Sequence, residues 1–310
     1  MNGIINVLKP PGMSSFQVVR VLRGLLKIKH IGHAGTLDPG AAGVLLVGVG
    51  KACRLLHFIS EFDKVYVAEL TLGISTTTQD ADGETTAVDE TVSVTPNQLG
   101  TAFSRFLGRI EQIPPMASAV KVNGKPLYKL QRQGISVEPK PRKVFIKELH
   151  INKVWTYGDS LTFGSRVLFY VRCSKGTYIR TLCHDVGRAL GTHAHMSFLV
   201  RTEIGPFSCA SSHTLEEIEA MAEKDDFSFI LPMEAALPDY PRVRVAPLAE
   251  KRILNGNAVT PDYLVDVPKT LTVGDRVLLM SLDGNLLAVG VIQYKGQLIC
   301  HPIRVLREGN

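Results

Sequence analysis

The stretch that decides the fold is the glycine-rich segment Gly32-His33-Ala34-Gly35-Thr36-Leu37-Asp38-Pro39-Gly40-Ala41-Ala42-Gly43. Its glycines let the backbone turn tightly or approach another chain closely, and Pro39 biases the residue before it toward an extended conformation. Because the apolar run 44–49 follows directly, the pattern predicts a constrained loop that leads into a buried strand. The carboxylate of Asp38 lies at the most constrained point, where a rigid scaffold can present it to a cleft.

This segment does not match the known nucleotide-binding loops. No glycine lies five residues before Gly50-Lys51, and Ala52 stands where a magnesium-binding Ser or Thr would be needed. Asp-Pro-Gly by itself is a common turn signal, so the segment indicates a function only in combination with other motifs in the chain.

Those other motifs are present. Residues 32–45 resemble the catalytic motif of pseudouridine synthases, and of the TruB family in particular. Further motifs of this family occur in the family's order and at similar spacing: LKPPGMSS (8–15), DKVY (63–66), TQDADG (78–83), IPPM (113–116), SAVK (118–121), CSKGTYIR (173–180) and LVRT (199–202). Each motif alone would be weak, but the ordered set spans most of the chain.

The resemblance implies an isomerase that converts uridine to pseudouridine at position 55 in the T-arm of tRNA. The reaction breaks the bond between uracil N1 and ribose C1′ and joins ring carbon C5 to C1′. It involves no redox change and no energy input, so the resemblance implies no cofactor and no metal. The expected partner is the T-stem-loop of tRNA.

The family also implies roles for three catalytic side chains. Asp38 corresponds to the nucleophile, and attack at ribose C1′ or at uracil C6 remains open. Arg180 corresponds to the cation held against that carboxylate, to which a planar guanidinium is well suited. Tyr66 corresponds to the tyrosine that stacks on the target ring and serves in proton removal from C5.

A base inside folded RNA must be flipped out before an enzyme can reach it. By resemblance, Tyr178 packs beside the flipped base, Leu199 forms an apolar wall, and His33 enters the space that the nucleotide leaves. Asp80 is expected to contact the substrate or Arg180, although a role in capping a turn is also open.

Positive charge is concentrated in one segment. The chain has a net charge of +6, and residues 121–147 hold eight Lys or Arg against Glu138 alone, so this segment carries +7 and the remainder −1. A run of one sign predicts a polyanionic partner. By resemblance it belongs to a thumb-like insertion at about 116–147 that contacts RNA phosphates through Lys121, Lys125, Lys129, Arg132, Lys140, Arg142 and Lys143.

The length of 310 residues predicts two domains of an α+β protein. We expect a pseudouridine synthase catalytic domain at 1–238, built on a mixed, mainly antiparallel sheet flanked by helices. A small β-barrel-like PUA domain, an RNA-binding module, is expected at 239–310. Strands are predicted at 3–8, 44–49, 64–73, 144–155 and 161–172, and helices at 16–27, 52–59, 96–107, 178–190 and 214–224.

Composition excludes several classes of protein. The longest uncharged apolar run, 41–50, is far shorter than the roughly 20 residues of a membrane span. No signal peptide is apparent, so we expect a cytoplasmic protein, and a monomer. Five scattered cysteines without a C-x-x-C pair argue against disulfides and thiolate zinc sites, and His193-x-His195 lacks further ligands for a metal.

Two alternatives stay open. One is the subunit of a guide-RNA-dependent pseudouridine synthase, which shares the catalytic motifs. The other is a non-catalytic protein that binds or folds tRNA. The basic insertion and the small terminal module favour a stand-alone enzyme, and the intact set of Asp38, Tyr66, Tyr178 and Arg180 argues against an inactive relative. One departure from the family is Ala117, where a tyrosine is frequent.

Overall fold

A nine-stranded sheet forms the centre of the N-terminal part of the chain in the computed structural model, which describes residues 1–135, 137, 139–156, 158–268 and 270–307. Its order is β1-β3-β12-β4-β11-β10-β7, with β2 paired to β3 and β13 to β12. Of its pairings only β12 with β3 is parallel among the described residues, which confirms a mixed, mainly antiparallel sheet. The strands are β1 (Gly3–Lys9), β2 (Ile31–Ala34), β3 (Ala42–Val49), β4 (Lys64–Leu72), β7 (Gly108–Gln112), β10 (Arg142–Trp155), β11 (Arg166–Cys173), β12 (Ala194–Ile204) and β13 (Phe207–Ser208).

Three of the described helices begin at a residue whose side chain caps the helix. Ser14, Thr95 and Thr214 each accept a hydrogen bond from the backbone three residues on and form a capping box with a Gln or Glu side chain. The helices are α1 (Ser15–Leu26), α2 (Leu56–Ser60), α3 (Pro96–Ser104), α4 (Leu127–Arg132), α5 (Ile179–Ala189), α6 (Leu215–Ala222) and α7 (Pro247–Leu254). Among the described helices, none is both long and apolar enough to cross a membrane.

The helix expected at 52–59 is wrong in its first half. The chain leaves β3 through Gly50, whose φ is +60° and whose N–H donates to the carbonyl of His30 at 2.7 Å. This tight exit starts a 3₁₀ helix at Gly50–Leu55, and α-helical geometry begins only at α2.

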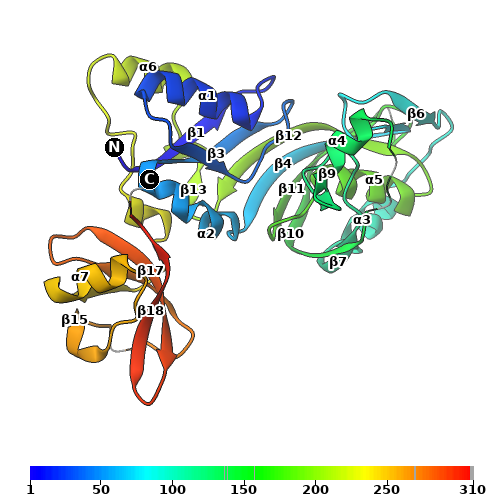
Figure 1. Cartoon of the computed structure of the whole chain (residues 1–310). Coiled ribbons are helices and arrows are strands. Elements are labelled where there is room, and N and C mark those ends of the chain that lie inside the picture. The colour runs from blue at the N-terminus through cyan, green and yellow to red at the C-terminus, as the bar shows by residue number, and fades with distance from the viewer. Residues whose placement is uncertain (136, 138, 157, 269, 308–310) are drawn as a thin grey trace.

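β3 is buried on both of its faces, as the apolar run predicts. Leu45 and Val47 pack against α1 and α6, while Val44 and Leu46 contribute to a second cluster with Leu55 of the 3₁₀ helix. Figure 1 shows α1 and α6 together over this end of the sheet. The segment that precedes β3 is therefore anchored to the most rigid part of the fold.

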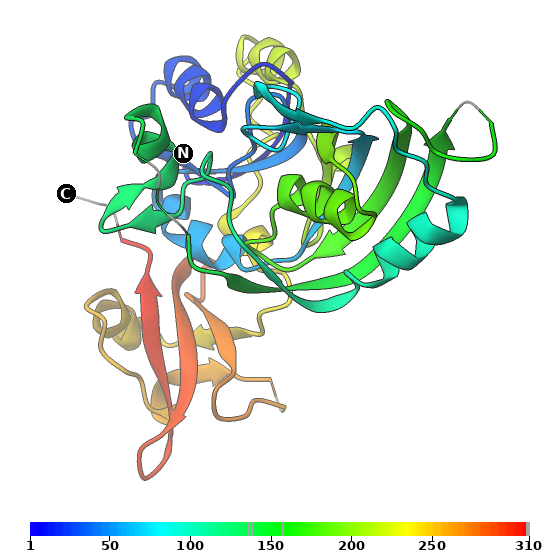
Figure 2. The same cartoon turned by 90° about the vertical axis from the view of Figure 1, so that its right-hand side faces the viewer.

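The other half of the sheet packs against α3 and α5. Phe103 of α3 contacts Phe169 of β11 edge to face, with ring centroids 5.4 Å apart, and Leu182 of α5 is fully buried in the same cluster. Figure 2 shows the sheet curving around α5. The start of α5, which carries Arg180 and directly follows Tyr178, is thereby fixed against the centre of the sheet.

β12 is a central strand that sequence patterning did not identify. It lies between β3 and β4 and meets β3 in parallel at Gly43, opposite Arg201. Gly43 has a φ of +110°, and a Cβ there would lie 2.1 Å from the carbonyl oxygen of Arg201. The last glycine of the motif is therefore required so that two backbones can approach.

Short hairpins extend from the sheet. β5 (Ile74–Thr76) pairs with β6 (Thr85–Val88) on either side of the aspartate-rich segment, and β8 (Lys121–Val122) pairs with β9 (Lys125–Pro126) in the basic insertion. The turn between β8 and β9 is formed by Asn123 and Gly124 with φ of +50° and +79°, as the Asn-Gly signal predicts.

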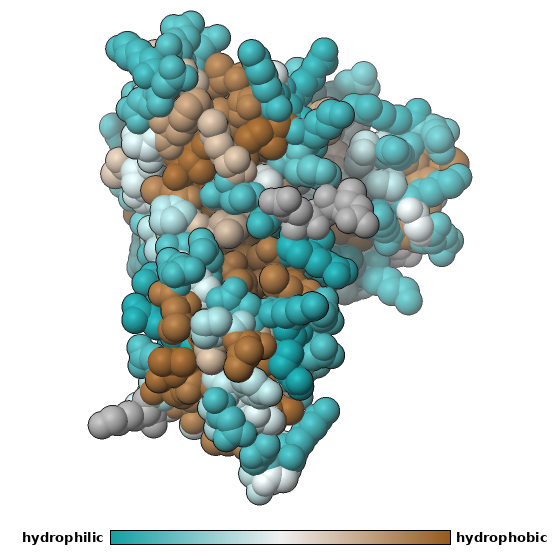
Figure 3. Space-filling view, turned by 60° about the vertical axis from the view of Figure 1, so that its left-hand side comes forward, coloured by the Kyte–Doolittle hydropathy of each residue, from teal (hydrophilic) through white to brown (hydrophobic). Residues whose placement is uncertain are grey.

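The C-terminal residues form a separate five-stranded sheet of order β15-β14-β16-β17-β18. The sequence predicts a barrel-like domain here. The described pairings run in a line from β15 to β18, so the strands form an open sheet that α7 covers. On the outer surface, Figure 3 shows that hydrophilic areas divide the apolar areas on one face of the molecule. The strands are β14 (Arg242–Val245), β15 (Leu264–Asp266), β16 (Arg276–Met280), β17 (Leu286–Tyr294) and β18 (Leu298–Val305).

An apolar interface joins the two sheets. Met280 and Leu286 of the C-terminal sheet belong to one buried cluster with Leu46 and Phe58 of the N-terminal part. Arg276 lies over the ring of Phe58 at 5.7 Å. The two parts therefore share a core as well as a connection along the chain.

Candidate active site

A cavity of about 1350 Å³ lies where the segment before β3 meets β4, β12 and the start of α5. All seven side chains predicted to act on the base line this one cavity, although they come from distant parts of the sequence. They are His33, Asp38, Tyr66, Asp80, Tyr178, Arg180 and Leu199.

The loop that carries Asp38 is held from behind by polar contacts. Ser15 Oγ accepts from the N–H of Leu37 at 2.9 Å, and Lys9 Nζ donates to the carbonyl of Pro39 at 3.2 Å. Lys9 is fully buried, and its ammonium also donates to the carbonyls of Pro10 and Met13. These contacts fix the backbone on both sides of Asp38, so the carboxylate is presented by a preorganised loop.

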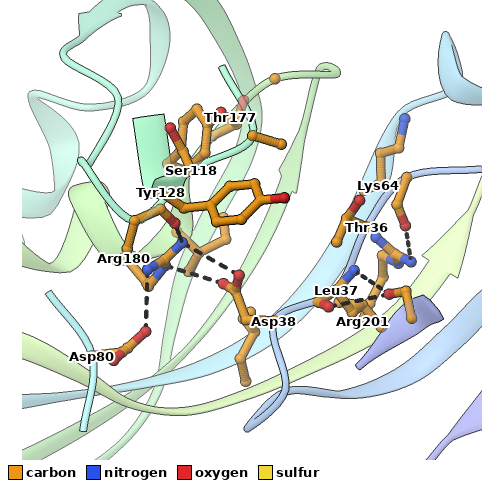
Figure 4. A pocket seen from close by; sticks show the side chains of 18 of the residues that line it. Thr36, Leu37, Asp38, Lys64, Asp80, Ser118, Tyr128, Thr177, Arg180 and Arg201 are labelled. Carbon is orange, nitrogen blue, oxygen red and sulfur yellow. Dashed lines mark hydrogen bonds and ion pairs between the residues drawn. The ribbon is translucent and has the colours of Figure 1, made fainter. Parts of the chain in front are cut away.

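Two nitrogens of the Arg180 guanidinium contact the carboxylate of Asp38. Its Nε lies 3.0 Å from Oδ2 and its Nη2 lies 3.3 Å from Oδ1. On its other side Nη1 contacts Oδ2 of Asp80 at 3.3 Å and the carbonyl of Thr78 at 3.1 Å, and Nη2 also donates to the carbonyl of Ala117 at 2.9 Å. Figure 4 shows the guanidinium between the two carboxylates. Asp80 therefore supports Arg180.

The charge state of Asp38 is set by opposing influences. Burial raises the pKa of this carboxyl, and the guanidinium of Arg180 is the largest influence that lowers it. The neighbouring carboxylates of Asp80 and Asp82 raise the pKa further, whereas the ammonium of Lys9 lowers it. Arg180 is thus the main group that favours the ionised form, which is the form that can act as a nucleophile.

Tyr66 and Leu199 reach the cavity from two neighbouring strands. Tyr66 of β4 pairs with Arg201 of β12, and Ala68 pairs with Leu199, so these side chains share one face of the sheet. Burial raises the pKa of the Tyr66 hydroxyl. The arrangement supplies a flat ring and an apolar side chain against which a planar base can pack.

His33 and Tyr178 lie at other parts of the lining. The backbone of Tyr178 is fixed by Gln112, whose side chain accepts from its N–H at 2.9 Å and donates to its carbonyl at 3.1 Å. His33 lies on β2, and its buried Nδ1 has no hydrogen-bond partner among the described residues. Burial, and then the charge of Arg201, lower the pKa of this imidazole.

The basic insertion forms part of the rim of the cavity. The seven cations predicted to contact phosphates are all exposed, and Arg132, Arg142 and Lys143 line the cavity itself. Within the described part of the chain, none of the seven has a carboxylate partner within 4 Å, whereas Lys147 pairs with Asp63 at 2.5 Å. Glu138 lies outside the described residues. The exposed cations remain available to an anionic ligand.

Sequence reasoning missed several lining residues. Figure 4 shows Tyr128 of α4 above Asp38, and its backbone N–H donates to the carbonyl of Ser118 at 3.0 Å. Lys64 and Arg201 also line the cavity, although both are buried. Both stand two residues from a predicted site residue on the same strand, and that spacing could have placed them on its face.

The two histidines considered as metal ligands are used in local hydrogen bonds. His193 Nδ1 lies 3.2 Å from Oγ of Ser75, and His195 Nδ1 lies 3.1 Å from the carbonyl of Ile74. Across the described residues, no group of three or more His, Cys, Asp or Glu side chains could hold a metal ion.

Comparison with known families agrees with the motifs. Residues 23–179 match the N-terminal domain of TruB family pseudouridylate synthases, residues 180–238 match the C-terminal domain of tRNA pseudouridylate synthase B, and residues 241–299 match the PUA domain. The fold and the three matches define the class as a pseudouridine-forming isomerase with an RNA-binding module. The chain belongs to the TruB family of pseudouridylate synthases.

Several relatives in this family are similar along nearly their whole length. The chain is 46% identical to the tRNA pseudouridine synthase B of Pelotomaculum thermopropionicum over 287 residues, which are 92% of this chain and 90% of the relative. It is 42% identical to the tRNA pseudouridine synthase B of Moorella thermoacetica over 307 residues, which are 98% and 99% of the two chains.

Among solved structures, the chain resembles chains of H/ACA RNP and Cbf5 complexes. A Cbf5-Nop10-Gar1 complex contains a chain with a TM-score of 0.73 and 28% identity, with 99% of this chain and 85% of that chain covered. An H/ACA RNP bound to a substrate RNA containing 2′-deoxyuridine gives a TM-score of 0.72 at 25% identity, with 98% and 85% covered. These likenesses confirm the expected fold.

Proposed function

We propose that the chain converts uridine to pseudouridine at position 55 in the T-arm of tRNA, acting alone and without a cofactor. The observation that carries the proposal is the paired contact of Asp38 with Arg180 in the cavity of a TruB-family fold. Relatives named tRNA pseudouridine synthase B support tRNA as the substrate.

In the proposed mechanism the target uridine is flipped into the cavity and packs on Tyr66, beside Tyr178 and Leu199. His33 fills the space that the base leaves. Asp38 attacks as a carboxylate, at ribose C1′ or at uracil C6, and the N1–C1′ bond breaks. One part of the nucleotide rotates and C5 joins C1′. Asp38 is then released, C5 loses its proton with the help of Tyr66, and N1 of the product carries a proton. Arg180 favours the ionised carboxylate and aims it, because its two nitrogens contact both carboxylate oxygens.

The guide-RNA-dependent alternative has support from the structural likeness to Cbf5 complexes. The sequence identities favour the stand-alone enzyme, since they are 42–46% to the two tRNA pseudouridine synthases and 25–28% to the chains of guide-RNA particles. The division into a catalytic domain at 1–238 and a PUA domain at 239–310 is part of this proposal. A monomeric state and a cytoplasmic location stay predictions.

The direct test is conversion of a short T-stem-loop RNA by the purified chain alone, measured as pseudouridine content. We expect multiple turnovers per enzyme without a second protein or a guide RNA, and no product when cytidine replaces the target uridine. Conversion only after a partner or guide is added would favour the guide-dependent alternative. Tight binding with no conversion under any of these conditions would favour the non-catalytic alternative.

The basic insertion should determine how strongly salt weakens RNA binding. Replacing Lys121, Lys125 and Lys129 with Gln should reduce the slope of log affinity against log salt by about two to three, if each neutralises one phosphate. A matched control removes three exposed cations outside the basic insertion: Arg105, Arg109 and Lys224. Equal slopes for the two triple variants, measured by filter binding, would show that these lysines do not contact phosphate.

A further inference from the structure

Arg201 is the largest side chain in the described structure that is fully buried, with 1% of its surface exposed. It lies in the middle of β12, and within the described residues no carboxylate lies within 4 Å of it. Burying a cation without a carboxylate partner is strongly unfavourable unless its donors are satisfied in another way. The contacts that Arg201 does make therefore identify its role.

Two of those contacts are to the ends of the segment that carries Asp38. Arg201 Nη2 donates to the carbonyl of Gly35 at 2.9 Å, and Nε donates to the carbonyl of Val44 at 2.8 Å. Gly35 lies three residues before Asp38, and Val44 lies in β3 directly after the loop. One guanidinium thus ties the two ends of the loop together, which a single ammonium could not do in the same geometry.

The third neighbour of Arg201 is Tyr66. The two residues are direct partners across β4 and β12, and both line the cavity. The charge of Arg201 lowers the pKa of the Tyr66 hydroxyl, in opposition to the larger effect of burial. A guanidinium has donors only, so the oxygen of Tyr66 is the acceptor in any hydrogen bond between the two side chains, and the tyrosine's own hydrogen is then free to point elsewhere.

Two other buried cations near the Asp38 loop, Lys64 and Lys9, donate their hydrogen bonds to backbone carbonyls. Lys64 Nζ donates to the carbonyls of Ser60 and Phe62, both at 2.5 Å. Lys9 Nζ donates to carbonyls of the loops around Pro10 and Pro39. Of Lys9, Lys64 and Arg201, it is therefore Arg201 that both contacts the Asp38 loop and lies across from Tyr66.

We propose that Arg201 is the positioning residue that couples the nucleophile loop to Tyr66. It holds the two ends of the Asp38 loop and donates to the oxygen of Tyr66, so that the O–H group of Tyr66 is directed toward the bound base. Arg201 itself does not touch the reacting atoms. This inference rests on the proposed function, in which Asp38 attacks and Tyr66 carries the base.

The test is a double-mutant cycle between Arg201 and Tyr66, measured by single-turnover and steady-state conversion of the T-stem-loop RNA. Arg201→Lys keeps the positive charge but loses the planar set of N–H donors. Arg201→Gln removes the buried charge and with it much of the free-energy cost of burying it. We expect each to lower kcat by about 30-fold or more while KM changes by less than about threefold. In the Tyr66→Phe background, where no oxygen remains to be held, the same changes should lower kcat several-fold less.

A matched control is Lys64→Met, which removes a buried cation from β4 on the same face as Tyr66. The effects of Lys64→Met and Tyr66→Phe on kcat should be independent, so that the double variant shows the product of the two. Among the described residues, the hydrogen bonds of Lys64 Nζ are to carbonyls that precede β4. Equal effects of the Arg201 changes in both backgrounds would overturn the proposal. Loss of folding in both Arg201 variants, followed by thermal unfolding, would also count against it by making Arg201 a structural residue. A wild-type chain that converts no RNA would instead contradict the proposed function.

Discussion

Asp38→Asn should lower kcat for pseudouridine formation by at least about 1000-fold, which corresponds to about 4 kcal/mol of transition-state stabilisation. Asn has nearly the same shape as Asp but cannot form the covalent bond that the proposed mechanism requires. RNA affinity should change by less than about threefold, since the expected phosphate contacts lie in the exposed cations of the basic insertion and not at Asp38. Rapid-quench measurement of product and filter binding of the same T-stem-loop separate the two effects.

Asp82→Asn is the matched control for this change. Asp82 also lines the cavity and raises the pKa of Asp38, yet it forms no ion pair with Arg180. Its loss should alter kcat by less than about tenfold. If Asp38→Asn retained activity similar to that of Asp82→Asn, Asp38 would not be the nucleophile.

Local patterns in the sequence predicted those helices and strands in which apolar residues recur at a single regular spacing. The run at 44–49 is a strand buried on both faces, and the helices expected at 16–27, 96–107 and 214–224 correspond to α1, α3 and α6. β12 does not obey one period, because its register against β4 shifts between Met196 and Phe198 and again between Arg201 and Glu203. A bulged strand with polar residues at buried positions does not alternate, so it was not recognised.

The candidate site could be predicted only through the family resemblance. The contact of Asp38 with Arg180 joins residues 142 positions apart, and no local pattern indicates such a pair. Contacts from side chains to distant backbone carbonyls could not be predicted from the sequence for the same reason. Arg180 donates to the carbonyl of Ala117, and Arg201 donates to that of Gly35. Since any residue can offer a carbonyl, these partners follow from the fold alone.

The second large effect is expected from Arg180. Arg180→Lys should lower kcat by about 100-fold or more, because one ammonium cannot reproduce the contacts with Asp38, Asp80 and the carbonyls of Thr78 and Ala117. Arg180→Gln should also lower the free energy of unfolding by up to about 3–5 kcal/mol, because the carboxylate of Asp80 is left buried without its cationic partner. Chemical denaturation measures this second effect.

The pH profile separates the electrostatic role of Arg180 from its role in holding the loop. Because its guanidinium lowers the pKa of Asp38, removing the charge in Arg180→Gln lets burial, Asp80 and Asp82 raise that pKa further. The carboxylate then takes up a proton at higher pH, so the acid limb of the kcat profile should move to higher pH. In Arg180→Lys, which keeps a cation, the limb should move less.

Arg188→Gln on the last turn of α5 is the control for this pH profile, since it removes an exposed arginine from the same helix. Its profile should coincide with that of the wild type, because Arg188 is not among the groups that shift the pKa of Asp38. An acid limb that stays in place in Arg180→Gln would mean that Asp38 does not depend on this guanidinium for its charge. Arg180 would then act through geometry alone, and the lower kcat of Arg180→Lys would reflect a displaced loop.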